Sequence, residues 1–163
     1  MQNRPVSIRT QLQPGDVGYL TYLHGKLYAE EYDYDYTFDA YVAIPLAEFS
    51  LRNNPREQIW LAEQDQQIKG AIAIVEKSTE LAHLRWFLLH PDLRGHGLGK
   101  RLLDLAINFC RQQGYAQIIL GTAAELRKAK TIYELAGFKL VNRETKNIWG
   151  KEEILEDYWM ELR

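Results

Sequence analysis

The spacing of hydrophobic residues changes several times along the chain, and each spacing predicts a type of element. Apolar residues recur every three or four positions in four segments, which is typical of helices with one buried face. These predicted helices cover residues 16–31, 37–49, 99–113 and 123–136. Other apolar runs are short and bounded by turn-forming residues, which predicts strands. These predicted strands cover residues 6–9, 58–63, 68–75, 81–90, 117–121, 138–141 and 155–162.

Several residues mark where these elements begin, bend or end. Asp16 follows a Pro-Gly pair, and we expect it to cap the first helix. Pro45 is expected to bend or interrupt the second helix, because proline lacks the N–H of the helical hydrogen bond. Gly114 and Gly137 are expected to end the third and fourth helices. The short turn at residues 64–66 predicts a hairpin between two strands.

The order of the elements and the length indicate the fold class. A chain of 163 residues without internal repeats fits one domain, so residues 1–163 are expected to form a single unit. Consecutive strands precede a strand–helix–strand–helix unit. This order predicts a mixed α/β fold.

Composition and charge exclude several classes of protein. The chain is 46% apolar, which is too high for a disordered protein, and its net charge of −2 argues against a nucleic-acid-binding surface. Its single cysteine, Cys110, cannot form an internal disulfide, and no His or Cys spacing predicts a metal site. No segment approaches the roughly 18 apolar residues of a membrane span, and residues 1–5 lack a signal-peptide pattern. We therefore expect a cytoplasmic protein with no nucleic-acid or membrane partner.

One glycine-rich segment carries candidate chemistry. Residues 94–100 read Arg-Gly-His-Gly-Leu-Gly-Lys, after a predicted strand and at the start of a predicted helix. Alternate glycines allow backbone N–H groups to converge at a helix N-terminus, where the helix dipole favours an anion. The segment matches neither a P-loop nor a dinucleotide fingerprint, since its glycine spacing is G-x-G-x-G. It therefore predicts a different kind of diphosphate-binding loop.

This segment resembles the Q/R-x-x-G-x-G/A element of the GNAT superfamily of N-acetyltransferases. Residues 88–91 are similar to the end of that family's fourth strand, and residues 132–138 to its L-Y-x-x-x-G-F element. Residues 24–32 and 38–42 resemble a bacterial subgroup whose domains are sometimes fused behind MarR-type regulators. The resemblance implies a GNAT-like fold, with a central, mostly antiparallel sheet and helices on both faces.

The resemblance also implies a cofactor, acetyl-CoA, and the residues that bind it. The glycine loop would hold the CoA pyrophosphate, and the strand before it would pair with the pantetheine arm. The implied cofactor-binding residues are Phe87, Leu88, Leu89, Arg94, Gly95, His96, Gly97, Leu98, Gly99, Lys100 and Tyr133.

Two catalytic roles follow from the same resemblance. Tyr133 stands where the family places the proton donor to the departing thiolate, although a core tyrosine would fit the same helix pattern. His83 stands where relatives often carry a glutamate that acts as general base, and Glu80, Glu30 and Glu31 remain alternatives through water. Leu126 replaces an asparagine found in many relatives, and either Glu125 or Thr122 could substitute for it.

The acceptor site is expected in the first two helices and their connector. Residues 28–39 hold five carboxylates, four tyrosines and no cation, a combination that suits a cationic amine. The predicted substrate-binding residues are Glu30, Glu31, Asp33 and Asp35, with residues 147–152 as the opposite rim. The alternative is a solvated acidic helix end with its tyrosines packed on the sheet.

Together these patterns predict an acetyl-CoA-dependent N-acetyltransferase that acts on a primary amine, with a small cationic amine as the expected acceptor. Two alternatives stay open: a non-catalytic acyl-CoA-binding module, and an acetyltransferase of protein or peptide amines. A homodimer is compatible with the resemblance. The sequence does not indicate the identity of the acceptor, the general base or the preferred acyl chain.

Overall fold

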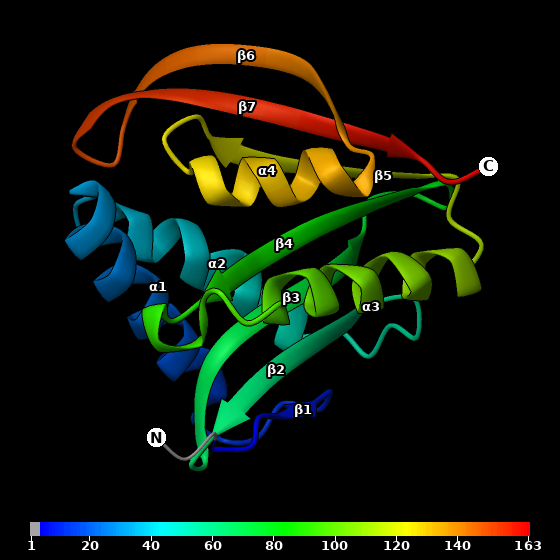
Figure 1. The fold of residues 1–163 in the computed structure, drawn as a ribbon, viewed down its shortest axis with the longest axis horizontal. Helices are drawn as coiled ribbons and strands as arrows, with labels where there is room; N and C mark the ends of the chain where they lie inside the picture. Colours follow the sequence, from blue (N-terminus) through cyan, green and yellow to red (C-terminus); the bar gives the residue numbers. More distant parts are fainter. Residues whose placement is uncertain (1–3) are drawn as a thin grey trace.

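The computed structural model describes residues 4–163, in which a seven-stranded sheet has the order β1-β2-β3-β4-β5-β7-β6 (Figure 1). The strands are β1 (Ser7–Arg9), β2 (Gln58–Gln64), β3 (Gln67–Glu76), β4 (Leu81–Leu89), β5 (Gln117–Ala123), β6 (Lys139–Ile148) and β7 (Lys151–Glu161). The helices are α1 (Asp16–Tyr32), α2 (Thr37–Leu51), α3 (Leu98–Gln112) and α4 (Arg127–Ala136), with a 3-10 turn, η1, at Pro91–Leu93. The predicted mixed α/β class is confirmed.

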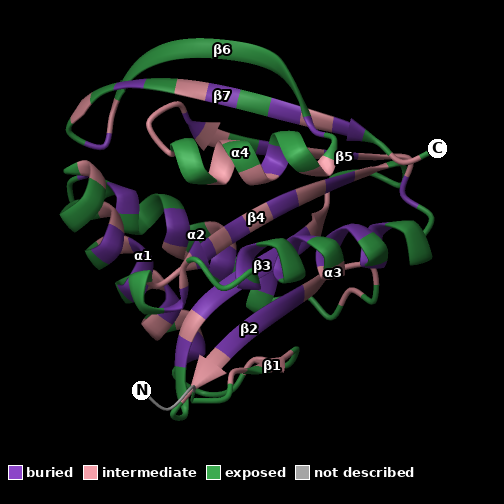
Figure 2. Cartoon of the chain, viewed as in Figure 1, coloured by how far each residue is buried: buried purple, intermediate pink, exposed green. Residues whose placement is uncertain are grey.

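Two hydrophobic cores hold the helices against opposite faces of the sheet. α3 and α4 contribute Leu102, Leu103 and Tyr133 to one core, whereas α1 and α2 contribute Leu20 and Leu46 to the other. Figure 2 shows the buried positions along the central strands and on the helix sides that face them. Each large aliphatic side chain buried in this way contributes about 1.5–3 kcal/mol. This burial explains why amphipathic segments cover both faces of the sheet.

The sheet is antiparallel except between β4 and β5, and this exception creates the site. The parallel pairing covers only Leu81–His83 of β4 against Gln117–Ile119 of β5. Beyond His83 the two strands separate, while β4 keeps pairing with β3 and β5 keeps pairing with β7. Figure 1 shows the resulting gap between β4 and the β5–β7–β6 part of the sheet.

Four expectations about individual elements are wrong. Gly15, at φ 92°, caps α1, and the carboxylate of Asp16 instead accepts a hydrogen bond from the Gln13 N–H (2.7 Å) and pairs with Arg9 (2.6 Å). α2 runs through Pro45 without interruption. α4 begins at Arg127, because β5 continues to pair with β7 as far as Ala123. The last two strands are longer than predicted and form one hairpin.

Three expectations concern features outside these elements. Part of the expectation about an export signal rests on residues 1–3, which lie outside the described residues. Among the helices of residues 4–163, none is long and apolar enough to cross a membrane. Over the same residues, no cluster of three or more His, Cys, Asp or Glu side chains is arranged to hold a metal ion.

Candidate active site

The edge of β4 is free where β5 turns away from it. After His83, the backbone of β4 still bonds to β3 on one side, but its other side faces the gap. A strand edge with unpaired N–H and C=O groups can accept an extended ligand as an additional strand. Phe87, Leu88 and Leu89, which the sequence assigned to the pantetheine arm, lie on this free edge and line a cleft of about 730 Å³.

A β-bulge at Trp86 changes the direction of the β4 side chains. Trp86 has φ +50°, and the β3–β4 register shifts between Ala71 and Ala73, which leaves one extra residue on β4. As a result, Arg85 and Trp86 both lie towards α2: the Arg85 guanidinium is 5.8 Å from the Tyr41 ring centre and 5.1 Å from that of Trp86. A left-handed conformation at a non-glycine residue costs about 1–2 kcal/mol, and such strained positions cluster at functional sites.

The glycine loop lies at one end of the cleft. Gly95 and Gly97 have φ values of +84° and +78°, a region that only glycine adopts at little cost. α3 begins at Leu98, and its first intrahelical bond joins the Arg101 N–H to the Gly97 carbonyl (3.0 Å), so the preceding N–H groups have no helical partner. A Cβ at Gly99 would lie 3.2 Å from Leu89 Cδ1. This bare backbone at a helix N-terminus fits a phosphate group.

The two cations predicted beside this loop already have partners within the chain. Arg94 donates to both oxygens of Glu31 in α1 (2.8 and 3.1 Å), and its Nε donates to the Leu89 carbonyl (3.0 Å). Lys100 pairs with Asp104 (2.7 Å). Sequence reasoning missed the Arg94–Glu31 pair, which joins elements 63 residues apart.

The start of α4 supplies two further cations to the cleft. Arg127 and Lys128 line it, and sequence reasoning did not select either of them. Of the predicted loop residues, His96 is exposed and Leu98 is buried, and neither side chain lines the cleft. Their contribution to an anion site is therefore confined to their backbone N–H groups.

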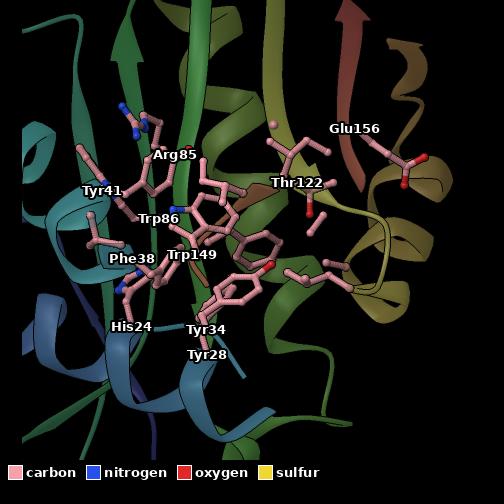
Figure 3. Close-up of a pocket in the computed structure, with 18 of the residues that line it drawn as sticks. His24, Tyr28, Tyr34, Phe38, Tyr41, Arg85, Trp86, Thr122, Trp149 and Glu156 are labelled. Atoms are coloured by element: carbon pink, nitrogen blue, oxygen red, sulfur yellow. The ribbon is translucent and has the colours of Figure 1, made fainter. Parts of the chain in front are cut away.

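A second pocket, of about 340 Å³, adjoins the cleft and reaches towards α2 and β7. The two cavities share Tyr28, Phe87, Leu126 and Ala129, so they meet beside the free edge of β4. Figure 3 shows the aromatic wall of this pocket. Its rings come from α1, α2, the connector between them, β4 and the β6–β7 turn, and they are Tyr28, Tyr34, Phe38, Tyr41, Trp86 and Trp149.

Tyr133 lies on α4 and lines the second pocket. It is 5% exposed, and its ring centre is 5.9 Å from that of Phe87, a residue common to both cavities. Burial raises the pKa of Tyr133 well above its usual value, and the nearby Tyr28 hydroxyl adds to this effect. The phenol therefore keeps its proton throughout the physiological pH range.

His83 lies where β4 and β5 separate, and it lines the same pocket. Burial lowers its pKa to about 4, the positive charges of Arg85 and Lys77 act in the same direction, and Asp157 opposes them. The imidazole is therefore neutral at pH 7. It can accept a hydrogen bond or relay a proton, but it is a weaker base than an exposed histidine.

His24 also lines the pocket, and sequence reasoning did not assign it a role. Its Nδ1 lies 2.8 Å from the Leu20 carbonyl of the same helix, so Nδ1 carries the proton and donates it. Its Nε2 is buried without a hydrogen-bond partner among the described residues. Burial lowers the pKa of His24 to about 4, against which the bond to Leu20 acts weakly.

The buried neutral state of His24 predicts a stability that depends on pH. Its pKa is about 4 in the folded protein and 6.5 in the unfolded chain. The unfolded state therefore binds more protons between these values, and the free energy of unfolding falls as pH decreases from 6.5 towards 4. For this one group the loss between pH 7 and pH 5 is about 2 kcal/mol.

Denaturant unfolding at pH 7 and pH 5 measures this loss. The His24→Gln variant should lose about 2 kcal/mol less than the unsubstituted protein over the same pH interval. An identical pH dependence in the two proteins would contradict the neutral assignment of His24.

The four predicted acceptor carboxylates do not line the second pocket. Glu31 faces the cleft and pairs with Arg94, whereas Asp35 accepts a hydrogen bond from the Thr37 N–H (2.9 Å) at the start of α2. Glu30 and Asp33 are exposed. The helical repeat of α1 leaves Glu30 exposed and turns Tyr28 inwards, and a role of the four carboxylates in acceptor binding stays a prediction.

Other candidates from the sequence are divided between the two cavities. Leu126 lines both, and Thr122 lines the second pocket. Glu125 lines the cleft and pairs with Lys151 (3.1 Å). The rim expected from residues 147–152 is present in part, since Ile148 and Trp149 line the second pocket.

Comparisons with known proteins place this geometry in a class. Residues 28–150 match the family model of the acetyltransferase (GNAT) domain. The chain belongs to this family. The resemblance found in the sequence is thereby confirmed at the level of the family.

Relatives and solved structures agree with this assignment. Human N-acetyltransferase 8B is 27% identical over 100 residues, which are 56% of this chain and 43% of that protein. This chain spans about half the length of the curated relatives it matches. Two solved structures share the fold. An acetyltransferase-type protein of Salmonella typhimurium with acetyl-CoA has a TM-score of 0.77, with 16% identity over 97% of this chain and 94% of its own. Spermidine N-acetyltransferase of Vibrio cholerae with CoA and spermine has a TM-score of 0.72, with 17% identity over 96% of this chain and 95% of its own.

Proposed function

We propose that the protein is an acetyl-CoA-dependent N-acetyltransferase that transfers an acetyl group directly to a primary amine. The observation that carries this proposal is the meeting of the two cavities beside the free edge of β4. The cleft ends at the glycine loop, and the second pocket contains Tyr133 and His83. A cofactor arm and an amine can thus reach one point from opposite sides. The similarity of residues 24–32 and 38–42 to domains fused behind MarR-type regulators remains a prediction.

The chain offers fitting groups for each part of acetyl-CoA. The loop from Gly95 to Gly99 presents backbone N–H groups to the pyrophosphate, and Arg127 and Lys128 add positive charge along the cleft. The edge of β4 at Phe87–Leu89 can pair with the amide groups of the pantetheine arm. When bound, acetyl-CoA supplies an acetyl group activated as a thioester.

The residues around the junction then have separate tasks. A backbone N–H of β4 polarises the acetyl carbonyl as negative charge develops on its oxygen. With acetyl-CoA bound, nitrogen would attack the carbonyl carbon and the C–S bond would break, the Tyr133 phenol would donate a proton to the departing sulfur, and the phenol would regain a proton through water from the one released by the amine. His83, neutral at pH 7, orients the amine and relays its proton to water. Holding the two reactants together supplies most of the rate gain.

A thiol-release assay tests the proposed function. The purified protein is mixed with acetyl-CoA and a panel of primary amines, and free CoA thiol is measured over time. We expect release above the amine-free rate with at least one amine, together with acetyl-CoA binding by calorimetry. Binding without release on any amine would favour the acyl-CoA-binding module instead. No binding of acetyl-CoA at millimolar concentration would contradict both functions.

A further inference from the structure

Arg85 places a positive charge without a counter-ion in the second pocket. Its guanidinium lines this pocket and contacts the rings of Tyr41 and Trp86. Within residues 4–163 it makes no ion pair and donates no side-chain hydrogen bond. By contrast, Arg9 and Arg56 each pair with a carboxylate. A planar guanidinium with free donors is suited to bind a carboxylate in two-point geometry.

The bulge of β4 explains why Trp86 lies beside Arg85 on the face of the pocket. The extra residue at Trp86 puts the side chains of Arg85 and Trp86 on the same face of the sheet. Without it, strand alternation would send these two neighbours to opposite faces. The chain thus keeps a strained backbone at the point that sets the Trp86 ring beside the Arg85 guanidinium.

The other charges of the pocket favour a zwitterion over a polycation. Asp157 lines the pocket, and its carboxylate accepts a hydrogen bond only from the neutral amide of Asn142 (3.1 Å) among the described side chains. The negative charge of Glu156 is already balanced by ion pairs with Arg143 (2.8 Å) and Lys130 (3.8 Å). Lys146, the remaining lysine or arginine of the lining, pairs with Glu144 (3.7 Å). Arg85 and Asp157 therefore offer one unpaired charge of each sign.

The remaining lining favours an apolar side chain on the ligand. Tyr34, Phe38 and Trp149 pack with ring centres 4.8–5.1 Å apart and form a continuous wall. In Figure 3 these three residues lie below Arg85, Thr122 and Glu156 in the view. An apolar side chain of the ligand, placed against this wall, would stack on aromatic faces and lose little polar hydration.

We infer that the acceptor is a free amino acid with an aromatic or large apolar side chain. Its α-carboxylate binds Arg85, its side chain packs on the aromatic wall, and its amine reaches the junction of the two cavities. This inference rests on the proposed function and replaces the small cationic amine suggested by the sequence. The acidic residues behind that suggestion lie outside the pocket.

Paired substrates test the role of the carboxylate. The kcat/KM of acetylation is compared for L-phenylalanine and phenethylamine, and for L-tryptophan and tryptamine, which differ within each pair only by the carboxylate. We expect each amino acid to exceed its amine at least tenfold once both are compared as their unprotonated amines. Equal or higher values for the amines would overturn the inference. Preferential use of spermidine would also overturn it, although the enzyme function would stand.

Substitution of Arg85 tests the residue itself. In Arg85→Gln, kcat/KM for L-phenylalanine should fall about 100-fold, while that for phenethylamine should stay within threefold. Arg111→Gln, at the end of α3 and outside both cavities, is the matched control and should change neither value. An equal loss on both substrates in Arg85→Gln would show that Arg85 only supports the fold, and would overturn its assignment.

Failure of the proposed function can be distinguished from failure of this inference. Should no amine be acetylated, binding of N-acetyl-L-phenylalanine and N-acetylphenethylamine to the CoA-saturated protein is measured by calorimetry. Tighter binding of the carboxylate compound, lost in Arg85→Gln, would support the carboxylate site without turnover. Equal or absent binding of the two compounds would overturn it.

Discussion

Replacement of Tyr133 by phenylalanine is expected to lower kcat about 100-fold, at the lower end of the usual effect of a general acid. The affinity for acetyl-CoA should stay within about twofold, because the variant keeps the ring and its contact with Phe87. Since burial raises the pKa of Tyr133, the phenol is protonated at every pH of the assay and always has a proton to donate. Steady-state kinetics and calorimetry together measure the two effects.

Tyr158→Phe is the matched control for this change. The Tyr158 ring contacts that of Tyr133 at 6.1 Å, but Tyr158 does not line the second pocket. Its buried hydroxyl has no hydrogen-bond partner among the described residues, so its removal should leave kcat unchanged and not lower stability. A kcat of Tyr133→Phe within twofold of the unsubstituted protein would contradict the acid role. A parallel loss of acetyl-CoA affinity would indicate that Tyr133 positions the cofactor instead.

The parts of the fold that the sequence predicted are those with strong periodicity and buried faces. α3 has Leu102, Leu103 and Ala106 on its buried side, and the apolar run of β4 is bounded by Pro91. These local patterns determine the element whatever surrounds it. The glycine loop was also predictable, because its alternate glycines and its position between strand and helix are visible in sequence.

The sequence predicted only the first part of β6, because this strand has no buried face. β6 is exposed at every position from Lys139 to Asn147, so no alternation of apolar and polar residues marks it. Its pairing with β7 alone makes it a strand. The interruption of α2 predicted at Pro45 is absent for a related reason. Burial of Val42, Leu46 and Phe49 against the sheet outweighs the local cost of one lost helical hydrogen bond.

The pocket could not be predicted because it depends on contacts between distant segments. Arg94 and Glu31 were assigned to different ligands, yet they bind each other across 63 positions. Arg85 and Trp86 share a face only because of the bulge, which the apolar sequence of β4 does not reveal. The sequence therefore predicted the glycine loop, whereas the proposal for the acceptor needed three-dimensional contacts.

Substitution of both loop glycines by alanine is expected to weaken acetyl-CoA binding by about 100-fold. Gly95 and Gly97 have positive φ values and open space around the missing Cβ, so the change adds strain without a clash. Each alanine costs about 1–2 kcal/mol in this conformation. The unliganded loop is expected to avoid this cost by relaxing to a backbone conformation in which its N–H groups no longer point into the cleft. Binding must then restore the strained form, and a total of about 3 kcal/mol corresponds to roughly a 100-fold weaker dissociation constant.

Gly114→Ala separates strain from anion binding. Gly114 has φ +80°, also with nothing within 4 Å of the place a Cβ would take, but it follows the other end of α3, away from the cleft. It should lower the unfolding temperature of the free protein more than the loop alanines do, because the free loop relaxes, and it should leave acetyl-CoA affinity within twofold. Calorimetric titration and thermal unfolding of both variants make the comparison. Unchanged affinity in the Gly95→Ala/Gly97→Ala protein would show that the loop does not bind the pyrophosphate. Binding through the loop amides requires the positive-φ backbone, which is strained at both alanines.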